Sequence, residues 1–126
     1  MEIRINPIGK PRMTQRDKWA KRKCVVKYFE FADKMREEAE EQHFRINDAV
    51  EIEFRIAMPK SWSKKKKIEM LGQSHTQKPD IDNLIKAVLD SLLKDDSGVH
   101  TVRARKYWGI DGQIKIINIS ENNDQG

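Results

Sequence analysis

Two pairs of aspartates and one lysine lie within a short stretch of the chain and could together bind a metal ion and a phosphate. Asp80 and Asp82 are two residues apart, and Asp95 and Asp96 are adjacent. In an extended segment, residues i and i+2 project to the same side, so Asp80 and Asp82 can converge on one cation. Lys86 follows Asp82 by four residues, one helical turn further along the same face. This spacing predicts a carboxylate site for a divalent cation.

Each aspartate also has a purely structural explanation. Asp is a favoured helix N-cap and complements the positive end of the helix dipole, so Asp82 alone would be interpreted as a cap. One acid of the Asp95-Asp96 pair could begin a turn with the following Ser-Gly. Two adjacent acids at the end of a helix, however, oppose its dipole. A bound cation would explain why both are present.

The ligand types favour Mg²⁺ or Mn²⁺, because aspartate offers only oxygen and leaves further positions for water and phosphate. The three histidines, His43, His75 and His100, are far apart and lack the spacing of a zinc site. The sequence also lacks a Ser-His-Asp signature, a glycine-rich phosphate loop and an HExxH motif.

A helix must separate the two acidic pairs. Apolar residues from Ile81 to Leu93 recur at i, i+3, i+4, i+7 and i+8, which predicts a helix. From Asn83 to Lys94 this helix would be about 18 Å long at 1.5 Å per residue. Asp96 can therefore approach Asp80 only if the chain folds back after the helix.

Other patterns predict the surrounding elements. Apolar spacings of three and four predict a helix from Val25 to about Phe44. Strict alternation from Val50 to Met58 predicts a half-buried strand. A short strand is expected at residues 3–5, followed by a loop over 8–23. Ser61 or Ser63 could cap a short helix that ends near Gly72.

Two further strands are predicted over 99–109 and 113–119, and the Asp111-Gly112 pair between them is typical of a hairpin turn. We therefore expect a small α+β sandwich with a mixed four-stranded sheet packed against helices, in the order β-α-β-α-α-β-β. Its size suits one domain over residues 1–126.

The charge balance favours a polyanionic partner. The 126 residues carry 25 Lys and Arg against 20 Asp and Glu, a formal net charge of +5, and the mean hydropathy is −0.81. The basic residues gather within 10–27, 60–67 and 103–106, each group close to an aromatic residue, as suits phosphate contacts and base stacking. Any single Trp is explained more simply as core. The candidate DNA contacts are Lys10, Arg12, Arg16, Lys64, Lys65, Lys66, Lys67, Lys78, Arg103 and Arg105.

The segment from Pro79 to Leu93, followed by Asp-Asp-Ser-Gly-Val up to Val99, resembles the RusA family of Holliday junction resolvases. Its pattern is D-x-D-N-L-x-K, then D-x-L, then D-D-x-x-V. The sequences KPRMTQ from Lys10 and KYWG from Lys106 resemble the phage and prophage branch. The chain length also matches, so the resemblance extends over the whole chain as a single RusA-like endonuclease domain.

This resemblance implies a homodimeric, Mg²⁺-dependent endonuclease that resolves four-way DNA junctions by paired, symmetric phosphodiester cleavage in recombination and repair. Asp80, Asp82 and Asp96 match the catalytic metal ligands, and Lys86 matches the lysine that positions or neutralises the scissile phosphate. Asp95 would be an outer-shell or turn residue.

Two other functions remain open from the residues alone. The first is a non-catalytic basic DNA-binding accessory protein, in which the acids are only caps and turns. The second is a metal-dependent nucleotide hydrolase, for which so basic a surface would be excessive. The single cysteine, Cys24, and the absence of a secretory h-region or a long apolar run favour the cytoplasm of a bacterial or phage-infected cell, with no membrane partner.

Overall fold

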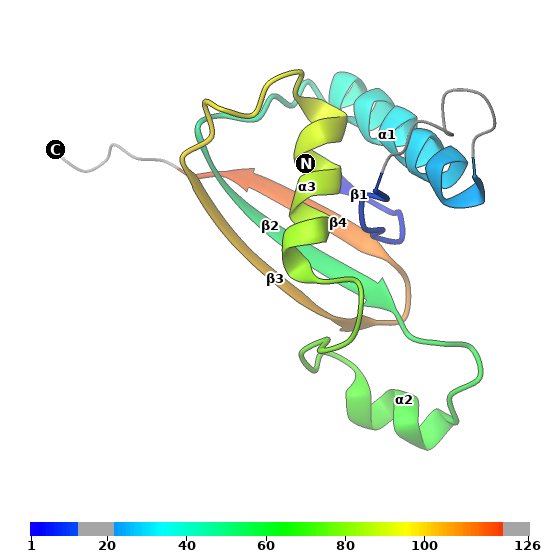
Figure 1. Ribbon diagram of the computed structural model, residues 1–126. Helices are drawn as coiled ribbons and strands as arrows, with labels where there is room; N and C mark the ends of the chain where they lie inside the picture. Colours follow the sequence, from blue (N-terminus) through cyan, green and yellow to red (C-terminus); the bar gives the residue numbers. More distant parts are fainter. Residues whose placement is uncertain (13–21, 120–126) are drawn as a thin grey trace, which may run out of the picture.

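A computed structural model describes residues 1–12 and 22–119, and its elements follow the predicted order. It has an α+β architecture in which a four-stranded sheet packs against helices (Figure 1). The elements are β1 (Glu2–Ile3), α1 (Lys23–Glu41), β2 (Ala49–Ala57), α2 (Lys64–Met70), α3 (Ile81–Leu92), β3 (Thr101–Gly109) and β4 (Gln113–Asn118).

The sheet is mixed, with the strand order β1-β4-β2-β3. The central strand β2 pairs in parallel with β3 and antiparallel with β4, and β1 pairs antiparallel with β4. The even-numbered residues of β2, from Val50 to Ile56, are buried against the helices. The alternation seen in the sequence therefore identified the strand and the face that it buries.

The predicted hairpin between the last two strands is wrong. β3 and β4 do not pair with each other, because β2 lies between them. Residues 110–112 instead connect the two strands that flank β2, and the Arg55 Nε donates to the Asp111 carbonyl at 3.1 Å. A Cβ on Gly112 would meet the backbone of Asn6, so the glycine allows a close approach of chains here.

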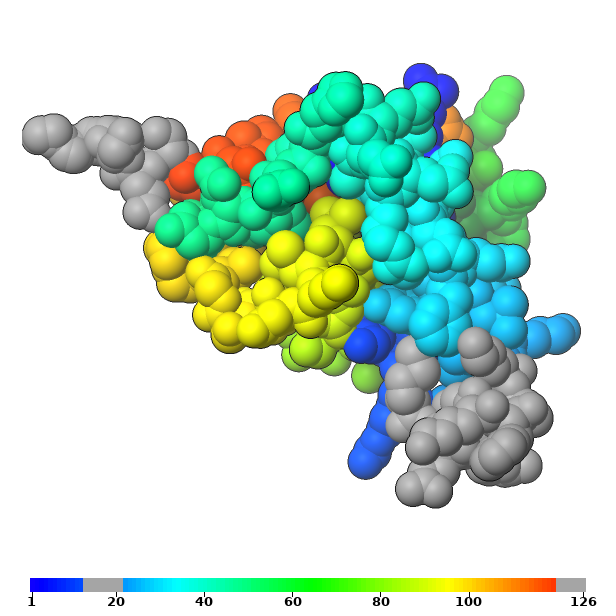
Figure 2. All heavy atoms as spheres, turned by 90° about the horizontal axis from the view of Figure 1, so that it is seen from above, coloured from blue at the N-terminus to red at the C-terminus, as the bar shows by residue number. Residues whose placement is uncertain are grey.

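Helices α1 and α3 pack against each other on one face of the sheet, as Figures 1 and 2 show. α1 ends at Glu41, three residues earlier than predicted, and it buries Tyr28 and Phe31, whereas Phe29 is 40% exposed. α3 buries Leu84, Ala87, Val88, Leu89 and Ser91. These apolar faces form one core with the inner face of the sheet.

α2 lies beyond the end of the sheet (Figure 1) and buries none of its residues. The Ser63 Oγ accepts a hydrogen bond from the Lys66 N–H at 3.2 Å, so Ser63, and not Ser61, is the cap. After α2, Gly72 has φ +81°, a conformation that favours glycine. Within the described ranges, no helix is both long and apolar enough to cross a membrane.

Candidate functional site

Asp80 and Asp82 lie at the start of α3, as the sequence predicted. Asp80 is the N-cap residue, and its carbonyl accepts the Asn83 and Leu84 N–H groups, each at 3.1 Å. The Asp80 side chain makes no capping hydrogen bond, and the Asp82 carboxylate accepts the adjacent Asn83 N–H at 2.9 Å. Capping therefore accounts for the position of Asp80 and leaves its carboxylate available for another role.

The segment before Asp80 is held in place by a lysine of the sheet. The Lys106 Nζ donates to the Gln77 carbonyl at 2.6 Å and to the Pro79 carbonyl at 2.7 Å. Lys106 lies on the helix-facing side of β3, in register with the buried Phe54. In the sequence Lys106 belongs to the basic cluster at 103–106, but strand alternation places it on the opposite face from Arg103 and Arg105.

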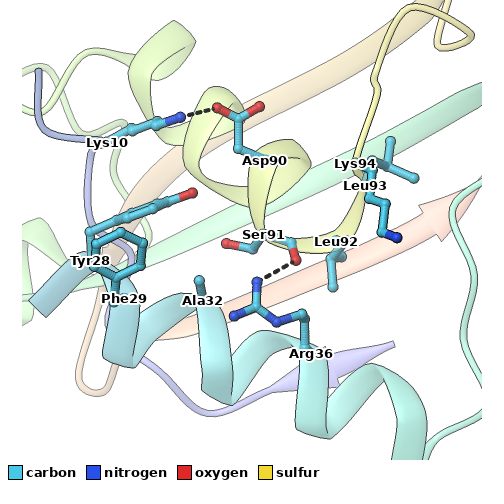
Figure 3. Close-up of a pocket in the computed structure, with 10 residues that line it drawn as sticks. All are labelled: Lys10, Tyr28, Phe29, Ala32, Arg36, Asp90, Ser91, Leu92, Leu93 and Lys94. Atoms are coloured by element: carbon cyan, nitrogen blue, oxygen red, sulfur yellow. Dashed lines mark hydrogen bonds and ion pairs between the residues drawn. The ribbon is translucent and has the colours of Figure 1, made fainter. Parts of the chain in front are cut away.

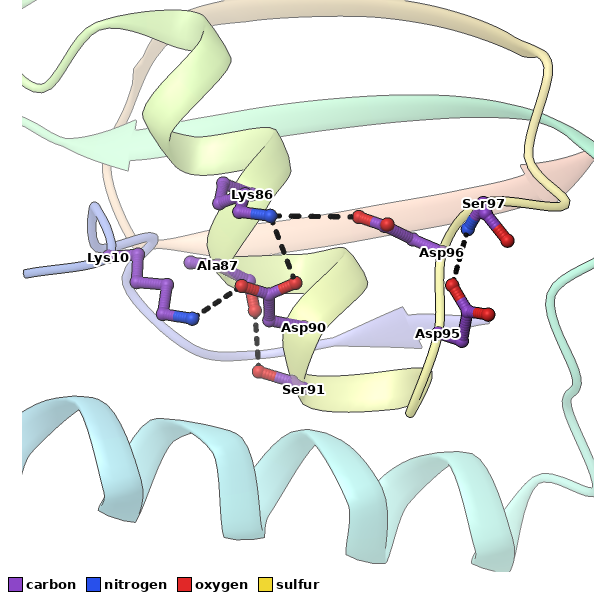
Figure 4. A network of polar contacts seen from close by, with 8 residues as sticks. All are labelled: Lys10, Lys86, Ala87, Asp90, Ser91, Asp95, Asp96 and Ser97. Carbon is purple, nitrogen blue, oxygen red and sulfur yellow. Dashed lines mark hydrogen bonds and ion pairs between the residues drawn. The ribbon is translucent and has the colours of Figure 1, made fainter.

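The chain folds back after α3 and brings Asp96 beside the middle of that helix (Figure 4). The C-cap residue Leu93 is extended, and the Asp96 carboxylate lies 3.8 Å from the Lys86 Nζ. The turn that the sequence required is therefore present, and it joins the second acidic pair to the lysine of α3.

Asp95 and Asp96 have different surroundings. Asp95 accepts a hydrogen bond from the Ser97 N–H at 2.9 Å, and its hydrogen bonds to Ser97 lower the pKa of its carboxyl. Figure 4 shows the Asp95 side chain pointing toward Ser97, whereas Asp96 points toward Lys86. Asp95 thus stabilises the turn that presents Asp96.

Asp90 is a site residue to which sequence analysis gave no role. Its carboxylate lies 2.5 Å from the Lys10 Nζ and 3.5 Å from the Lys86 Nζ, and its side chain is only 20% exposed. The hydrogen bond to Asp90 is the main cause of a raised pKa at Lys10. The spacing of Lys86 and Asp90 at i, i+4 is visible in the sequence, but the contact with Lys10, 80 residues away, is not.

A surface hollow of about 860 Å³ opens between α1 and α3 next to this network (Figure 3). Lys10, Tyr28, Asp90 and Arg36 contribute to its lining, and the Arg36 guanidinium donates to the Ser91 carbonyl at 3.2 Å. The hollow therefore lies against the Lys10–Asp90 pair.

The set of metal ligands stays a prediction. Over residues 1–12 and 22–119, no three Asp, Glu, His or Cys side chains already surround a common point where a metal could sit. Asp80 and Asp82 lie at the start of α3, and Asp96 lies beside its middle, where Lys86 is the nearest partner. The donors are all carboxylate oxygens, a set that suits Mg²⁺ or Mn²⁺.

The predicted DNA contacts are not all equivalent. Lys64, Lys65, Lys66 and Lys67 follow one another on α2, where the first three are exposed and Lys67 is half-buried. Arg103 and Arg105 lie on the outer face of the sheet opposite Glu51 and Glu53, at 4.0 and 3.3 Å. Lys10 is paired with Asp90, and Arg16 falls outside the described residues. Arg12 accepts a hydrogen bond from Arg22 through its carbonyl, and Lys78 precedes the Asp80 segment.

The aromatic residues divide between core and surface. Trp108 is buried, and both Trp62 and His75 pack against it, with ring centroids 4.8 and 4.3 Å away. Trp62 is half-buried and has the Lys66 Nζ 4.3 Å from its ring centroid. Trp108 thus has the core role expected of a single tryptophan, whereas Trp62 connects the core to the lysines of α2.

Comparison with known proteins identifies the family. A family model described as endodeoxyribonuclease RusA matches residues 4–118, which include both acidic pairs, Lys86 and every element after β1. No curated protein and no solved structure gives a significant match. Nucleases of this family depend on metal ions and act on branched DNA. The match does not distinguish branches of the family, so the phage or prophage assignment stays a prediction. Because the match covers nearly the whole chain, the protein belongs to the RusA family of Holliday junction endodeoxyribonucleases.

Proposed function

We propose that this protein is a Mg²⁺-dependent homodimer that resolves four-way junctions by paired, symmetric cleavage. In this proposal Asp80, Asp82 and Asp96 are the metal ligands and Lys86 contacts the scissile phosphate. The observation that carries the proposal is the position of Asp96, which folds back to within 3.8 Å of Lys86 on the helix that begins at Asp80. In this proposal Lys86 connects the acid that follows α3 to the two acids at its start.

The donor set fits a hard divalent cation. The Asp80 carboxylate makes no capping hydrogen bond, and the Asp96 side chain is 36% exposed, so both carboxylates can bind a cation from solvent. Mg²⁺, or Mn²⁺ as the alternative, would supply Lewis-acid stabilisation of the phosphate and activation of water when bound. The positive charge of the bound cation would also offset the repulsion among the three carboxylates.

Lys86 contributes positive charge where the phosphate gains negative charge. It is 55% exposed, so its ammonium group is accessible to a DNA phosphate. Asp90 and Asp96 on either side restrict the directions in which this long side chain points. Charge placed in advance toward the reacting phosphate stabilises the transition state more than the ground state.

The lysines of α2 and Lys78 would hold the DNA arms. They lie on the side of the molecule where α3 begins (Figure 1), so phosphates bound there pass close to Asp80 and Asp82. Arg103 and Arg105 would contribute less, because each faces a glutamate on β2. A two-fold homodimer would present two such sites to a substrate with matching symmetry.

The test separates a nuclease from a non-catalytic DNA-binding protein. We expect Asp82→Asn and Asp96→Asn to bind a labelled four-way junction as well as the unmodified protein does. Both should lose Mg²⁺-dependent cutting by at least about 100-fold, the size of effect expected when a charge-stabilising group is removed. Cutting is measured on a denaturing gel with Mg²⁺ and with EDTA.

Asp95→Asn is the matched control for Asp96→Asn, because it removes one carboxylate from the adjacent residue of the same turn. It should keep most of the activity. If all three variants cut like the unmodified protein, Asp82 and Asp96 are not catalytic ligands. If the unmodified protein binds the junction but cuts it neither with Mg²⁺ nor with EDTA, the acids are only caps and turns, and the accessory-protein interpretation holds. Preference for free nucleotides over branched DNA would instead favour a nucleotide hydrolase.

A further inference from the structure

Large aliphatic side chains are exposed around α2. Ile68 is 77% exposed, Leu71 is 50% exposed and Ile110 is 71% exposed. Leu71 and Ile110 line the same surface hollow of about 360 Å³, together with Arg55 and Tyr107. Ile68 precedes Leu71 by three residues, so the two lie on the same side of the helix. None of these side chains contributes to the core, so the fold itself does not explain them.

The charge around these aliphatic residues indicates what kind of partner they contact. Four of the seven residues of α2 are lysines, and Glu69 is its one acid. The Lys66 Nζ also lies over the ring of Trp62, which directs one of the lysines across an aromatic surface. Apolar side chains surrounded by lysines suit a polyanion that also exposes flat apolar groups, a description that fits DNA bases at a break in stacking.

α2 is anchored to the sheet although none of its residues is fully buried, and only Met70 among its apolar residues packs partly against the core. The segment after it bonds to the edge of β3, with the Gly72 N–H donating to the Trp108 carbonyl at 2.9 Å and the Trp108 N–H to the Gln73 carbonyl at 3.0 Å. The same segment continues to Asp80, whose approach is fixed by Lys106. α2 and the start of α3 lie at the same end of the molecule (Figure 1). A base contact made at α2 therefore helps to position the strand that reaches the aspartates.

We propose that Ile68, Leu71 and Ile110 form an apolar wedge that contacts the base faces exposed at the branch point of the junction, while the α2 lysines contact the flanking phosphates. In a linear duplex the base faces are covered by stacking, whereas at a branch point the end pairs of the arms can be exposed. The wedge thus recognises the branch, and the lysines bind any DNA backbone. This inference rests on the proposed junction cleavage and deepens it by naming residues for substrate choice.

The test uses a four-way junction carrying 2-aminopurine beside the branch point, and a linear duplex of the same sequence, both in EDTA so that nothing is cut. The unmodified protein should raise the 2-aminopurine fluorescence of the junction. Ile68→Ser combined with Leu71→Ser should abolish this rise and reduce the preference for junction over duplex about tenfold, as expected for a lost base contact. Ile110→Ser should also reduce the fluorescence rise and the preference for junction over duplex.

Two matched controls separate the wedge from general effects. Ile117→Ser changes a 44% exposed residue that pairs with Glu51, at the other end of β2, and should change neither signal. Lys65→Gln combined with Lys67→Gln should weaken junction and duplex binding alike. Thermal melting should be unchanged for the α2 variants, because α2 has no buried residue.

The proposal is overturned if the Ile68/Leu71 variant keeps both its junction preference and the fluorescence rise. It is also overturned if that variant changes the sedimentation of the free protein, since the aliphatic residues would then contact a second copy of the chain. Because these readouts need no metal, they are independent of the catalytic assignment. Asp82→Asn should keep the fluorescence rise even though it does not cut.

Discussion

Asp90 connects two lysines that come from distant parts of the chain. Lys10 approaches it from the segment after β1, and Lys86 approaches it from the preceding turn of α3. A lysine side chain that is half exposed samples many rotamers, so its ammonium group is not held in one position. The carboxylate of Asp90, which is largely shielded from solvent, restricts Lys86 and is itself fixed by Lys10. Asp90 is therefore a positioning residue for Lys86.

Replacing Asp90 with Asn keeps the size of the side chain and removes the charge that faces both lysines. We expect the single-turnover cutting rate to fall about tenfold, as for residues that orient a functional group, while junction affinity in EDTA changes less than about twofold. The rate is measured at saturating protein and the affinity by titration. Lys10→Arg should keep the rate, and Lys10→Met should reproduce part of the loss. If Asp90→Asn lowers only the melting temperature, its role is structural.

His75 makes the stability of the fold depend on pH. Its side chain is buried against Trp108, and its Nδ1 has no hydrogen-bond partner in the part of the chain that the structure describes. Burial first, and the charge of Lys106 second, lower the pKa of His75 below its ordinary value of 6.5. The folded protein thus resists protonation of a ring that the unfolded chain protonates readily.

The stabilising contribution of neutral His75 should be complete above pH 6.5 and should be lost as the pH falls through the lowered pKa. We expect the free energy of unfolding to decrease between about pH 7 and 5, and His75→Phe to flatten that decrease. Urea unfolding at several pH values across this range measures the free energy of unfolding. His43→Asn, at an exposed turn residue with φ 53°, is the control and should leave the slope unchanged. An equal slope in His75→Phe would mean that other groups cause the pH dependence.

At the scale of elements, regular patterns predicted what local sequence determines. The alternation of β2 and the 3.6-residue spacing of α3 identified both elements and their buried faces. The hairpin failed because strand neighbours are chosen by long-range burial, and β2 takes the place between β3 and β4. The role of Lys106 was missed for the same reason, since its partners belong to the segment before α3.

The candidate site was predictable to a similar degree. The spacing of Asp80, Asp82 and Lys86 follows from helix geometry, and the need for a fold-back after α3 follows from helix length. The direction of that fold-back, which turns Asp96 and not Asp95 toward Lys86, depends on the turn at Ser97. Lys10 could not be placed, because nothing local in its segment indicates a partner on α3.

The cap of α2 gives a prediction at this scale. Ser63→Ala removes the hydrogen bond to the Lys66 N–H, a loss of about 1 kcal/mol for a typical N-cap. Because α2 has no buried residue, the effect should appear as faster amide exchange within α2 and not as a lower global melting temperature. Ser61→Ala, the other residue that the sequence offered as a cap, should leave the exchange of α2 unchanged. A global loss of stability in Ser63→Ala would mean that α2 is coupled to the core.

At the scale of the whole molecule, the net charge of +5 is unevenly distributed. On the outer face of the sheet, Arg103 and Arg105 lie opposite glutamates, so this face is closer to neutral. α2, in contrast, carries four lysines and one glutamate. One group of positive charges therefore lies on α2, at the end of the molecule where α3 begins. In the proposed homodimer, a junction held there would meet one set of carboxylates per chain, so we expect paired nicks to need both chains.

A mixed dimer tests this requirement. Unmodified chains and Asp82→Asn chains carry different tags, and the mixed species is isolated by two successive affinity steps. On a supercoiled plasmid with an extruded cruciform, the unmodified dimer should nick both strands in one encounter and give linear product. The mixed dimer should give nicked circles, because it has one intact set of carboxylates. Dimers of two unmodified, differently tagged chains are the control and should give linear product. Linear product from the mixed dimer would show that one chain cuts both strands and that the two-fold arrangement is not needed for resolution.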